Sequence, residues 1–146
     1  MFKRIIGTKD DLSAFVLRLT LGCVFFPHGA QKALGWFGGH GLSATLAAFT
    51  DKMHIPIIFA ILAVAAEFLG AIALILGFFT RLAALGIAVV MVVAIYMVHG
   101  ANGLFMNWSG TQKGEGIEYH LLVIAIAVAL MIKGAGSFSV DKKLSK

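Results

Sequence analysis

The chain has 146 residues, which is enough for one domain, and its formal net charge is +5. Hydrophobic residues make up 60% of it and charged residues 13%, whereas soluble globular domains average about half and about a quarter. This composition, with a mean hydropathy of +0.93, excludes an ordinary soluble domain and indicates a membrane protein.

Residues 3–11 form a short polar segment, in which Thr8, Asp10 or Asp11 is placed to cap the first predicted helix, and the apolar segments follow it. A transmembrane helix needs about 20 apolar residues, and four segments reach or approach that length. They run over residues 12–34, 55–79, 82–99 and 118–133. Within residues 42–54, apolar side chains recur on one face, which is typical of a short interfacial helix. The sequence therefore predicts one all-α domain over residues 1–146, an antiparallel four-helix transmembrane bundle with a short interfacial helix between spans one and two.

Basic residues are distributed unequally between the two ends of the predicted bundle. If the spans alternate in direction, one side receives most of them: Lys3, Arg4, Lys9, Arg81, Lys133, Lys142, Lys143 and Lys146. The other side receives Lys32, Lys52 and Lys113. By the positive-inside rule, both termini are expected in the cytoplasm and the chain in the inner (plasma) membrane. The basic ends are expected to contact anionic headgroups of the lipid bilayer, and this distribution argues against a nucleic acid partner.

Glu67 is the most informative residue, because a carboxylate near the middle of a transmembrane segment is costly unless it faces a partner. On the first span, His28 and Lys32 share a face and lie toward the outer end. His99 ends the third span and Glu118 opens the fourth, also at the outer end. These positions predict an outward-opening pocket with Glu67 at its floor, for a small ligand or for protons. Two further candidates are Tyr119, beside Glu118, and Arg18, which lies deeper and is placed to approach Glu67 from below.

Each candidate also has a structural interpretation. Glu67 could form a satisfied pair with Arg18 or His28, and Glu118 could cap its helix. Lys32 and Tyr119 could be interfacial anchors. A metal held by His28, Glu67, His99 and Glu118 lacks the close ligand spacing that makes a metal site convincing, so no metal site is assigned. Haem ligation by two histidines on different spans is a less favoured alternative.

The order of several motifs resembles the DoxX family of four-span membrane proteins over nearly the whole chain. The matching stretches are Arg18-Leu…Gly22…Phe25…His28-Gly29…Lys32, Gly35-Trp-Phe-Gly-Gly-His-Gly41, Glu67-Phe-Leu-Gly70, Gly77…Thr80-Arg81-Leu-Ala-Ala84, Met91…His99, Gly114-x-Gly-x-Glu118-Tyr119 and Gly134-Ala-Gly-Ser…Ser139-Val-Asp141. The resemblance implies a four-helix transmembrane bundle. In some archaea a protein of this family name is a membrane subunit of thiosulfate:quinone oxidoreductase, and an actinobacterial relative is linked to a membrane oxidative-stress complex that includes superoxide dismutase.

Two functions are consistent with these observations. The first is a membrane subunit of a quinone- or thiol-linked oxidoreductase system, with quinone as the candidate ligand. The single cysteine, Cys23, has no partner for thiol relay chemistry, so such a subunit would act with a redox partner subunit and not as an enzyme alone. The alternative is a non-enzymatic membrane scaffold or small-solute conduit. Small residues on outer faces of the spans permit a homo-oligomer without requiring one.

Overall fold

The computed structural model describes residues 6–145, so the predictions that concern Lys3, Arg4 and Lys146 lie outside the described residues. Over this range the chain is helical and has no strand, which confirms the all-α prediction. The long helices are α2 (Leu12–Leu34), α4 (Ile57–Leu76), α5 (Thr80–Ala94) and α6 (Glu118–Lys133). The short ones are α3 (Gly41–Ala47), the π-helices η1 (Ala48–Lys52) and η2 (Ile95–His99), the 3₁₀-helix η3 (Gly100–Asn102) and α7 (Val140–Leu144).

Three of the predicted spans coincide with helices that are long and apolar enough to cross a membrane, among residues 6–145. They are Leu12–Leu34, Ile57–Leu76 and Thr80–Asn102, the last being α5 continued through η2 and η3. The fourth segment has the predicted bounds, 118–133, but α6 has 16 residues and is only about 24 Å long at 1.5 Å per residue. Because the hydrocarbon layer is about 30 Å thick, a fourth crossing remains a prediction.

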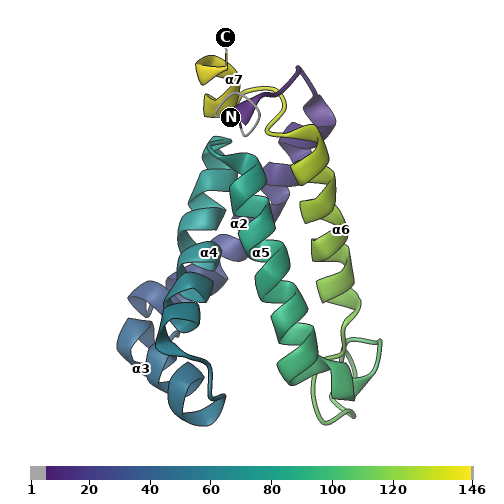
Figure 1. Ribbon diagram of the computed structural model, residues 1–146. Helices are drawn as coiled ribbons and strands as arrows, with labels where there is room; N and C mark the ends of the chain where they lie inside the picture. The colour runs from purple at the N-terminus through teal and green to yellow at the C-terminus, as the bar shows by residue number, and fades with distance from the viewer. Residues whose placement is uncertain (1–5, 146) are drawn as a thin grey trace.

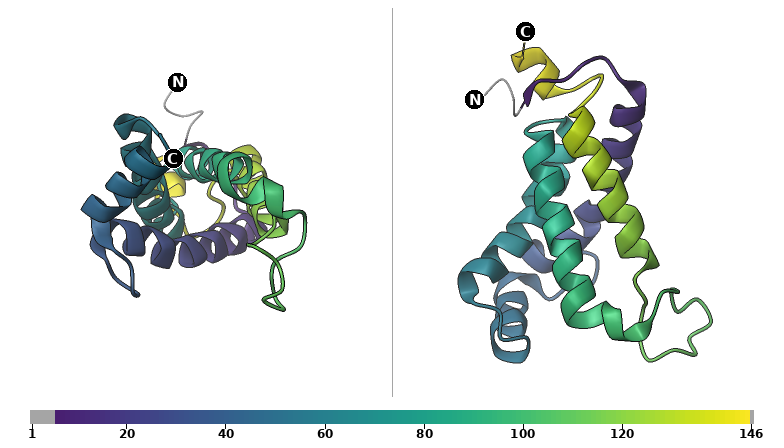
Figure 2. Two further views of the ribbon diagram at one scale, coloured as in Figure 1. Left: turned by 90° about the horizontal axis from the view of Figure 1, so that it is seen from below. Right: turned by 45° about the vertical axis from the view of Figure 1, so that its right-hand side comes forward.

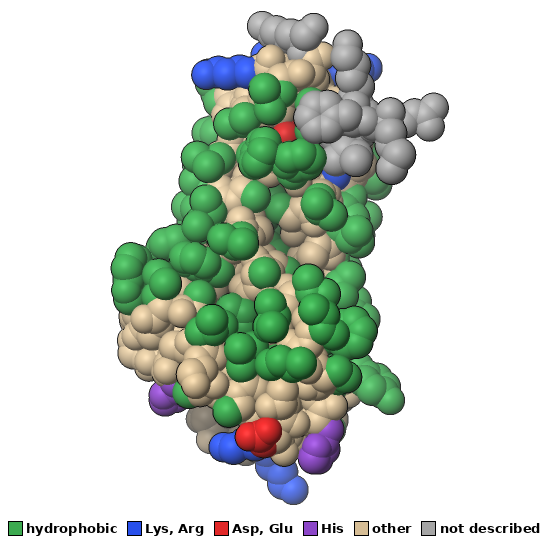
Figure 3. Space-filling model, turned by 60° about the vertical axis from the view of Figure 1, so that its left-hand side comes forward, with side chains coloured by type: hydrophobic (Ala, Val, Ile, Leu, Met, Phe, Trp, Pro, Cys, Tyr) green, Lys and Arg blue, Asp and Glu red, His purple; other side chains and the backbone are tan. Residues whose placement is uncertain are grey.

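The long helices run antiparallel and surround a common centre, with the start of α2 and helix α7 at the same end of the bundle (Figures 1 and 2). The α3 segment and the loop between η3 and α6 lie at the opposite end (Figure 1). Figure 3 shows a face that is mostly covered by hydrophobic side chains, with charged and histidine side chains gathered toward the two ends. An apolar band between polar ends is the pattern expected for a bundle whose outer surface meets lipid.

Helices α2 and α4 pack closely because two glycines on α2 leave room for the backbone of α4. A Cβ atom at Gly29 would lie 2.5 Å from the Cα atom of Phe68, and one at Gly22 would lie 2.8 Å from Cγ1 of Ile75. Small residues let helices approach in this way within lipid. The contact at Gly29 places the C-terminal end of α2 directly beside the middle of α4, where Glu67 lies.

The end of the bundle at which α2 begins is closed by residues 134–144, which we call the C-terminal clasp. Arg18, fully buried on α2, donates five hydrogen bonds to backbone carbonyl oxygens. Two acceptors, Leu74 and Ile75 at 3.0 and 2.7 Å, are in the last turn of α4, where carbonyls lose their ordinary helical partners; the Leu74 carbonyl also accepts from the N–H of Gly77 at 3.1 Å. The other three belong to the clasp: Ala135 at 2.9 Å, Ser137 at 3.0 Å and Phe138 at 2.7 Å.

Two side chains complete this closure. Asp141, 1% exposed, accepts hydrogen bonds from the backbone N–H groups of Phe79 at 2.8 Å and Thr80 at 3.0 Å, and so caps the start of α5. Arg81 donates to the carbonyls of Met131 and Ile132 at the end of α6. The last carbonyls of α6 are available to Arg81 because a helix end leaves them without helical partners, whereas the carbonyls at the end of α4 are bound by Arg18.

Candidate functional site

The partner of Glu67 is Lys32. The lysine Nζ lies 2.5 Å from Oε2 of the carboxylate, and the side chains of Lys32 and Glu67 are 28% and 6% exposed. Glu67 is about 15 Å along α4 from its start at Ile57. The backbone around Lys32 is itself fixed, because its carbonyl accepts a hydrogen bond from Oγ1 of Thr45, on α3, at 3.3 Å. The ion pair therefore joins the last turn of α2 to the middle of α4.

A second group of polar side chains is formed where the end of α5 meets the start of α6. The rings of His99 and His120 have centroids 4.2 Å apart with a 42° tilt, and those of Tyr119 and His120 are 5.6 Å apart. His99 belongs to the π-helix η2, a wider turn often found at functional sites. Tyr119 also interacts electrostatically with Glu67. We call Lys32, Glu67, His99, Tyr119 and His120 the polar cluster.

Two buried atoms of the polar cluster lack ordinary hydrogen bonds. Within residues 6–145, the phenol Oη of Tyr119 is buried without a hydrogen-bond partner. Nδ1 of His120 likewise makes no hydrogen bond of good geometry, although the carbonyl of Gly116, one turn earlier, interacts with the ring. An unpaired buried polar group costs about 1–3 kcal/mol. Each such atom can donate or accept one more hydrogen bond, which a bound molecule would supply.

The structure separates the remaining predicted residues from this cluster. Arg18 lies at the opposite end, where the clasp carbonyls take its hydrogen bonds. His28 is exposed, and its ring lies 6.2 Å from that of Phe25. Oε1 of Glu118 accepts a hydrogen bond from the backbone N–H of Met106 at 2.8 Å, so this carboxylate organises the preceding loop. Of the seven predicted positions, Lys32 and Glu67 form one contact, and His99 and Tyr119 lie together through His120. That all seven serve one site stays a prediction.

His120 was not predicted as a site residue, although the sequence holds a signal for it. Its side chain is 5% exposed, and it lies on the same face of α6 as the buried residues Val123, Ala127 and Leu130. The spacing of these residues, three or four apart, marks the face that packs against the bundle. A histidine in phase with that face must point inward.

The metal interpretation finds no cluster to support it. Across residues 6–145, the structure contains no group of three or more His, Cys, Asp or Glu side chains that could hold a metal ion. What the polar cluster offers is one buried carboxylate, one ammonium group, a phenol and two imidazoles. The ammonium group, the phenol and an imidazole N–H can donate hydrogen bonds to an acceptor, and the carboxylate can accept them.

The fold and this intramembrane ion pair define an integral membrane protein, and comparison with known proteins gives its family. The DoxX family model matches residues 13–100, which is more than half of the chain, so the chain belongs to the DoxX family. The match contains Lys32, Glu67 and His99 but ends before Tyr119 and His120.

Two relatives match along most of their length. The chain is similar to inner membrane protein YqjF of Escherichia coli (strain K12), with 26% identity over 137 residues that cover 94% of this chain and 95% of the relative. It is also similar to an uncharacterized protein of Haemophilus influenzae, with 32% identity over 136 residues that cover 89% of each. No solved structure matches the chain.

Proposed function

We propose that the protein crosses the inner (plasma) membrane several times, with both termini in the cytoplasm. The printed name of the Escherichia coli relative, an inner membrane protein, supports the location. Lys9, Arg81, Lys133, Lys142 and Lys143 lie at or near the clasp end of the helices, as the positive-inside rule requires of a cytoplasmic end. The polar cluster then lies in the outer half of the bilayer.

In this position the polar cluster binds a small molecule that accepts hydrogen bonds, and a quinone fits best. The observation that carries this proposal is the phenol Oη of Tyr119, which is buried and has no hydrogen-bond partner among residues 6–145. A quinone carbonyl oxygen accepts hydrogen bonds from a phenol and from an ammonium group such as that of Lys32. Its ring is apolar enough to reach the cluster through lipid.

The protein would serve as the membrane subunit of an oxidoreductase system and not as the whole enzyme. Reduction of a quinone to a quinol takes two electrons and two protons. The single cysteine, Cys23, provides no dithiol in this chain, so a redox partner subunit supplies the electrons. The polar cluster supplies binding and orientation, and Glu67 and His120 are groups that can exchange the protons.

Ligand-induced thermal stabilisation tests this proposal. The purified protein is heated in detergent with and without a short-chain ubiquinone, and saturation at about 100 times the dissociation constant should add about 2.7 kcal/mol of stability. Tyr119→Phe and Glu67→Gln should lose at least half of the rise in melting temperature. Tyr96→Phe is the matched control, because Tyr96 is 90% exposed and should respond like the wild type.

The rival function, a scaffold or solute conduit, predicts a different result. A scaffold would show no stabilisation by the quinone in any variant, while a partner protein would co-purify with wild type, Tyr119→Phe and Glu67→Gln alike. Equal stabilisation of wild type and both cluster variants would show that quinone binds elsewhere and would refute the assignment to the polar cluster.

A further inference from the structure

The outer face of the C-terminal clasp exposes apolar side chains beside basic ones. Phe138 is 76% exposed and Leu144 is 52% exposed, in a segment that follows the end of α6. Lys142 and Lys143 are their neighbours in sequence. Because the clasp packs on the ends of α2, α4 and α5, this face lies at the level where the spanning helices leave the hydrocarbon.

The position of the Phe138 side chain is fixed, because buried groups hold its backbone. Its φ of 52° is in the left-handed region that a bulky residue rarely adopts. The carbonyls of Ser137 and Phe138 accept hydrogen bonds from Arg18 at 3.0 and 2.7 Å, and the Phe138 ring meets that of Phe15 edge-on at 5.4 Å. A strained conformation fixed in this way indicates that the exposed ring has a use.

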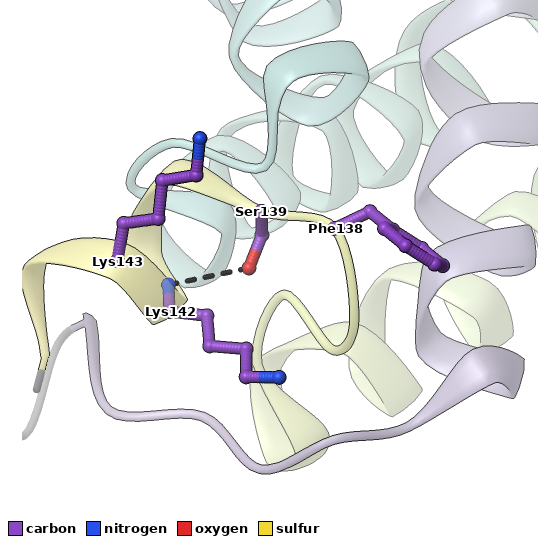
Figure 4. A pocket seen from close by; sticks show the side chains of 4 residues that line it. All are labelled: Phe138, Ser139, Lys142 and Lys143. Carbon is purple, nitrogen blue, oxygen red and sulfur yellow. Dashed lines mark hydrogen bonds between the residues drawn. The ribbon is translucent and has the colours of Figure 1, made fainter.

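A hollow of about 210 Å³ lies beside this ring, lined by Phe138, Ser139, Lys142 and Lys143 (Figure 4). The two lysine side chains extend in different directions around Ser139, and Phe138 points away on the other side (Figure 4). Lys142 forms an ion pair with Asp10. The ammonium group of Lys143 has no acidic partner within residues 6–145, so the hollow keeps an uncompensated positive charge.

We infer that this hollow binds the headgroup of an anionic phospholipid in the leaflet next to the clasp. The lipid phosphate would lie against Lys143, the lysine that has no acidic partner among residues 6–145, and the Phe138 ring would lie at the boundary between headgroups and acyl chains, where aromatic side chains are favoured. A free phosphate ion would use the charge but would leave Phe138 exposed to water. The site is at the opposite end of the bundle from the polar cluster and does not depend on the proposed quinone function.

Lipid retention measured by mass spectrometry of the intact protein tests the inference. The full chain is equilibrated in detergent with equal amounts of phosphatidylglycerol and phosphatidylcholine, and bound lipids are counted. The wild type should retain at least threefold more phosphatidylglycerol. Lys143→Gln should lower the ratio at least twofold. Phe138→Asn should reduce retention of both lipids, and asparagine tolerates positive φ, so the clasp backbone is preserved.

Lys113→Gln is the matched control, because Lys113 is an exposed lysine in the loop at the other end and should retain the wild-type ratio. Helical circular dichroism and melting temperature verify that each variant is folded. Equal retention of the two lipids by the wild type, or the same ratio in Lys143→Gln as in the wild type, would overturn the inference. So would complete displacement of phosphatidylglycerol by inorganic phosphate, which would identify a site for free anions.

Discussion

Replacing Lys32 by methionine isolates the contribution of the ion pair inside the bundle. Methionine keeps an unbranched side chain of similar length but removes the ammonium group that lies 2.5 Å from Glu67. The Glu67 side chain, 6% exposed, would then be a buried carboxylate without its counter-charge. Breaking a buried pair from one side costs about 3–5 kcal/mol. Because the lysine side chain is 28% exposed, solvent already screens part of the attraction, and we expect the lower end, about 3 kcal/mol.

Removing the charge of Glu67 should destabilise the protein less than removing the charge of Lys32, because Glu67 is more buried than Lys32. In Glu67→Gln the unpaired group is the ammonium of Lys32, which can turn toward solvent or headgroups, and we expect a loss of about 1 kcal/mol. The double variant Lys32→Met, Glu67→Gln contains no buried charge and should be more stable than Lys32→Met alone. The coupling energy between the two positions should therefore be about 2 kcal/mol.

Thermal unfolding in detergent, followed by circular dichroism, measures these differences. At about 2–4 °C per kcal/mol for a chain of this size, Lys32→Met should melt about 6–12 °C below the wild type. Lys113→Met, which removes an exposed loop lysine, should melt within about 2 °C of it. The reasoning fails if Lys32→Met melts with the wild type, or if the double variant loses the sum of the two single losses.

Two further predictions concern the clasp end of the bundle. Arg18→Lys replaces five N–H donors with three, so at least two of the five hydrogen bonds to carbonyls are lost, at about 1.5–3 kcal/mol each. The melting temperature of Arg18→Lys should fall more than that of Arg81→Lys, because Arg81 has three carbonyl acceptors and lysine has three donors for them. Equal falls in melting temperature for the two variants would contradict this reasoning. The ion pair with Lys133, at 2.6 Å, holds the pKa of Asp11 well below its ordinary value of 3.8. The stability from this pair is therefore complete above about pH 4 and is lost as the pH falls further. At about pH 6 the wild type should have a higher melting temperature than Asp11→Asn, and in acid this difference should disappear. A difference in melting temperature that does not change with pH would contradict the role of the ion pair.

The parts of the fold that were predictable follow from constraints that act along the chain. The length of an apolar segment sets the span, and residues 12–34 and 118–133 are helical over the predicted bounds. Asp11, one of three candidates, is the N-cap of α2 and accepts a hydrogen bond from the N–H of Ala14 at 3.1 Å. Both outcomes depend only on neighbouring residues, for which sequence is sufficient.

The partner of Glu67 was harder to predict, because it depends on how two helices cross. Helical rise alone placed Lys32 near the mouth of the site and Glu67 at its floor. The close contact at Gly29 brings the C-terminal end of α2 against the middle of α4, and the long lysine side chain covers the remaining distance. A glycine within an apolar helix was the available signal, but its partner surface on α4 is a tertiary property.

Arg18 was misplaced for a related reason. Depth put it in the inner half of the bundle, where an acid was the obvious partner for a buried cation. Its acceptors are instead carbonyls, and a helix end presents several carbonyls without partners. The glycine that ends α4, Gly77, and the run from Gly134 to Gly136 were the signs that backbone groups would be free at this level.

The buried cation Arg18 and the partly exposed cation Lys32 differ in how many N–H donors they leave free for a ligand. A guanidinium has five N–H donors, and Arg18 uses all five on carbonyls, so it has no donor for a ligand. An ammonium group has three, and Lys32 directs one of them to Glu67 while its side chain keeps 28% of its surface open. Tyr119 contributes a phenol that has no partner among residues 6–145. Lys32 and Tyr119 therefore keep donors that Arg18 does not, and this supports the proposal that a molecule with acceptor oxygens binds at the polar cluster and not at Arg18.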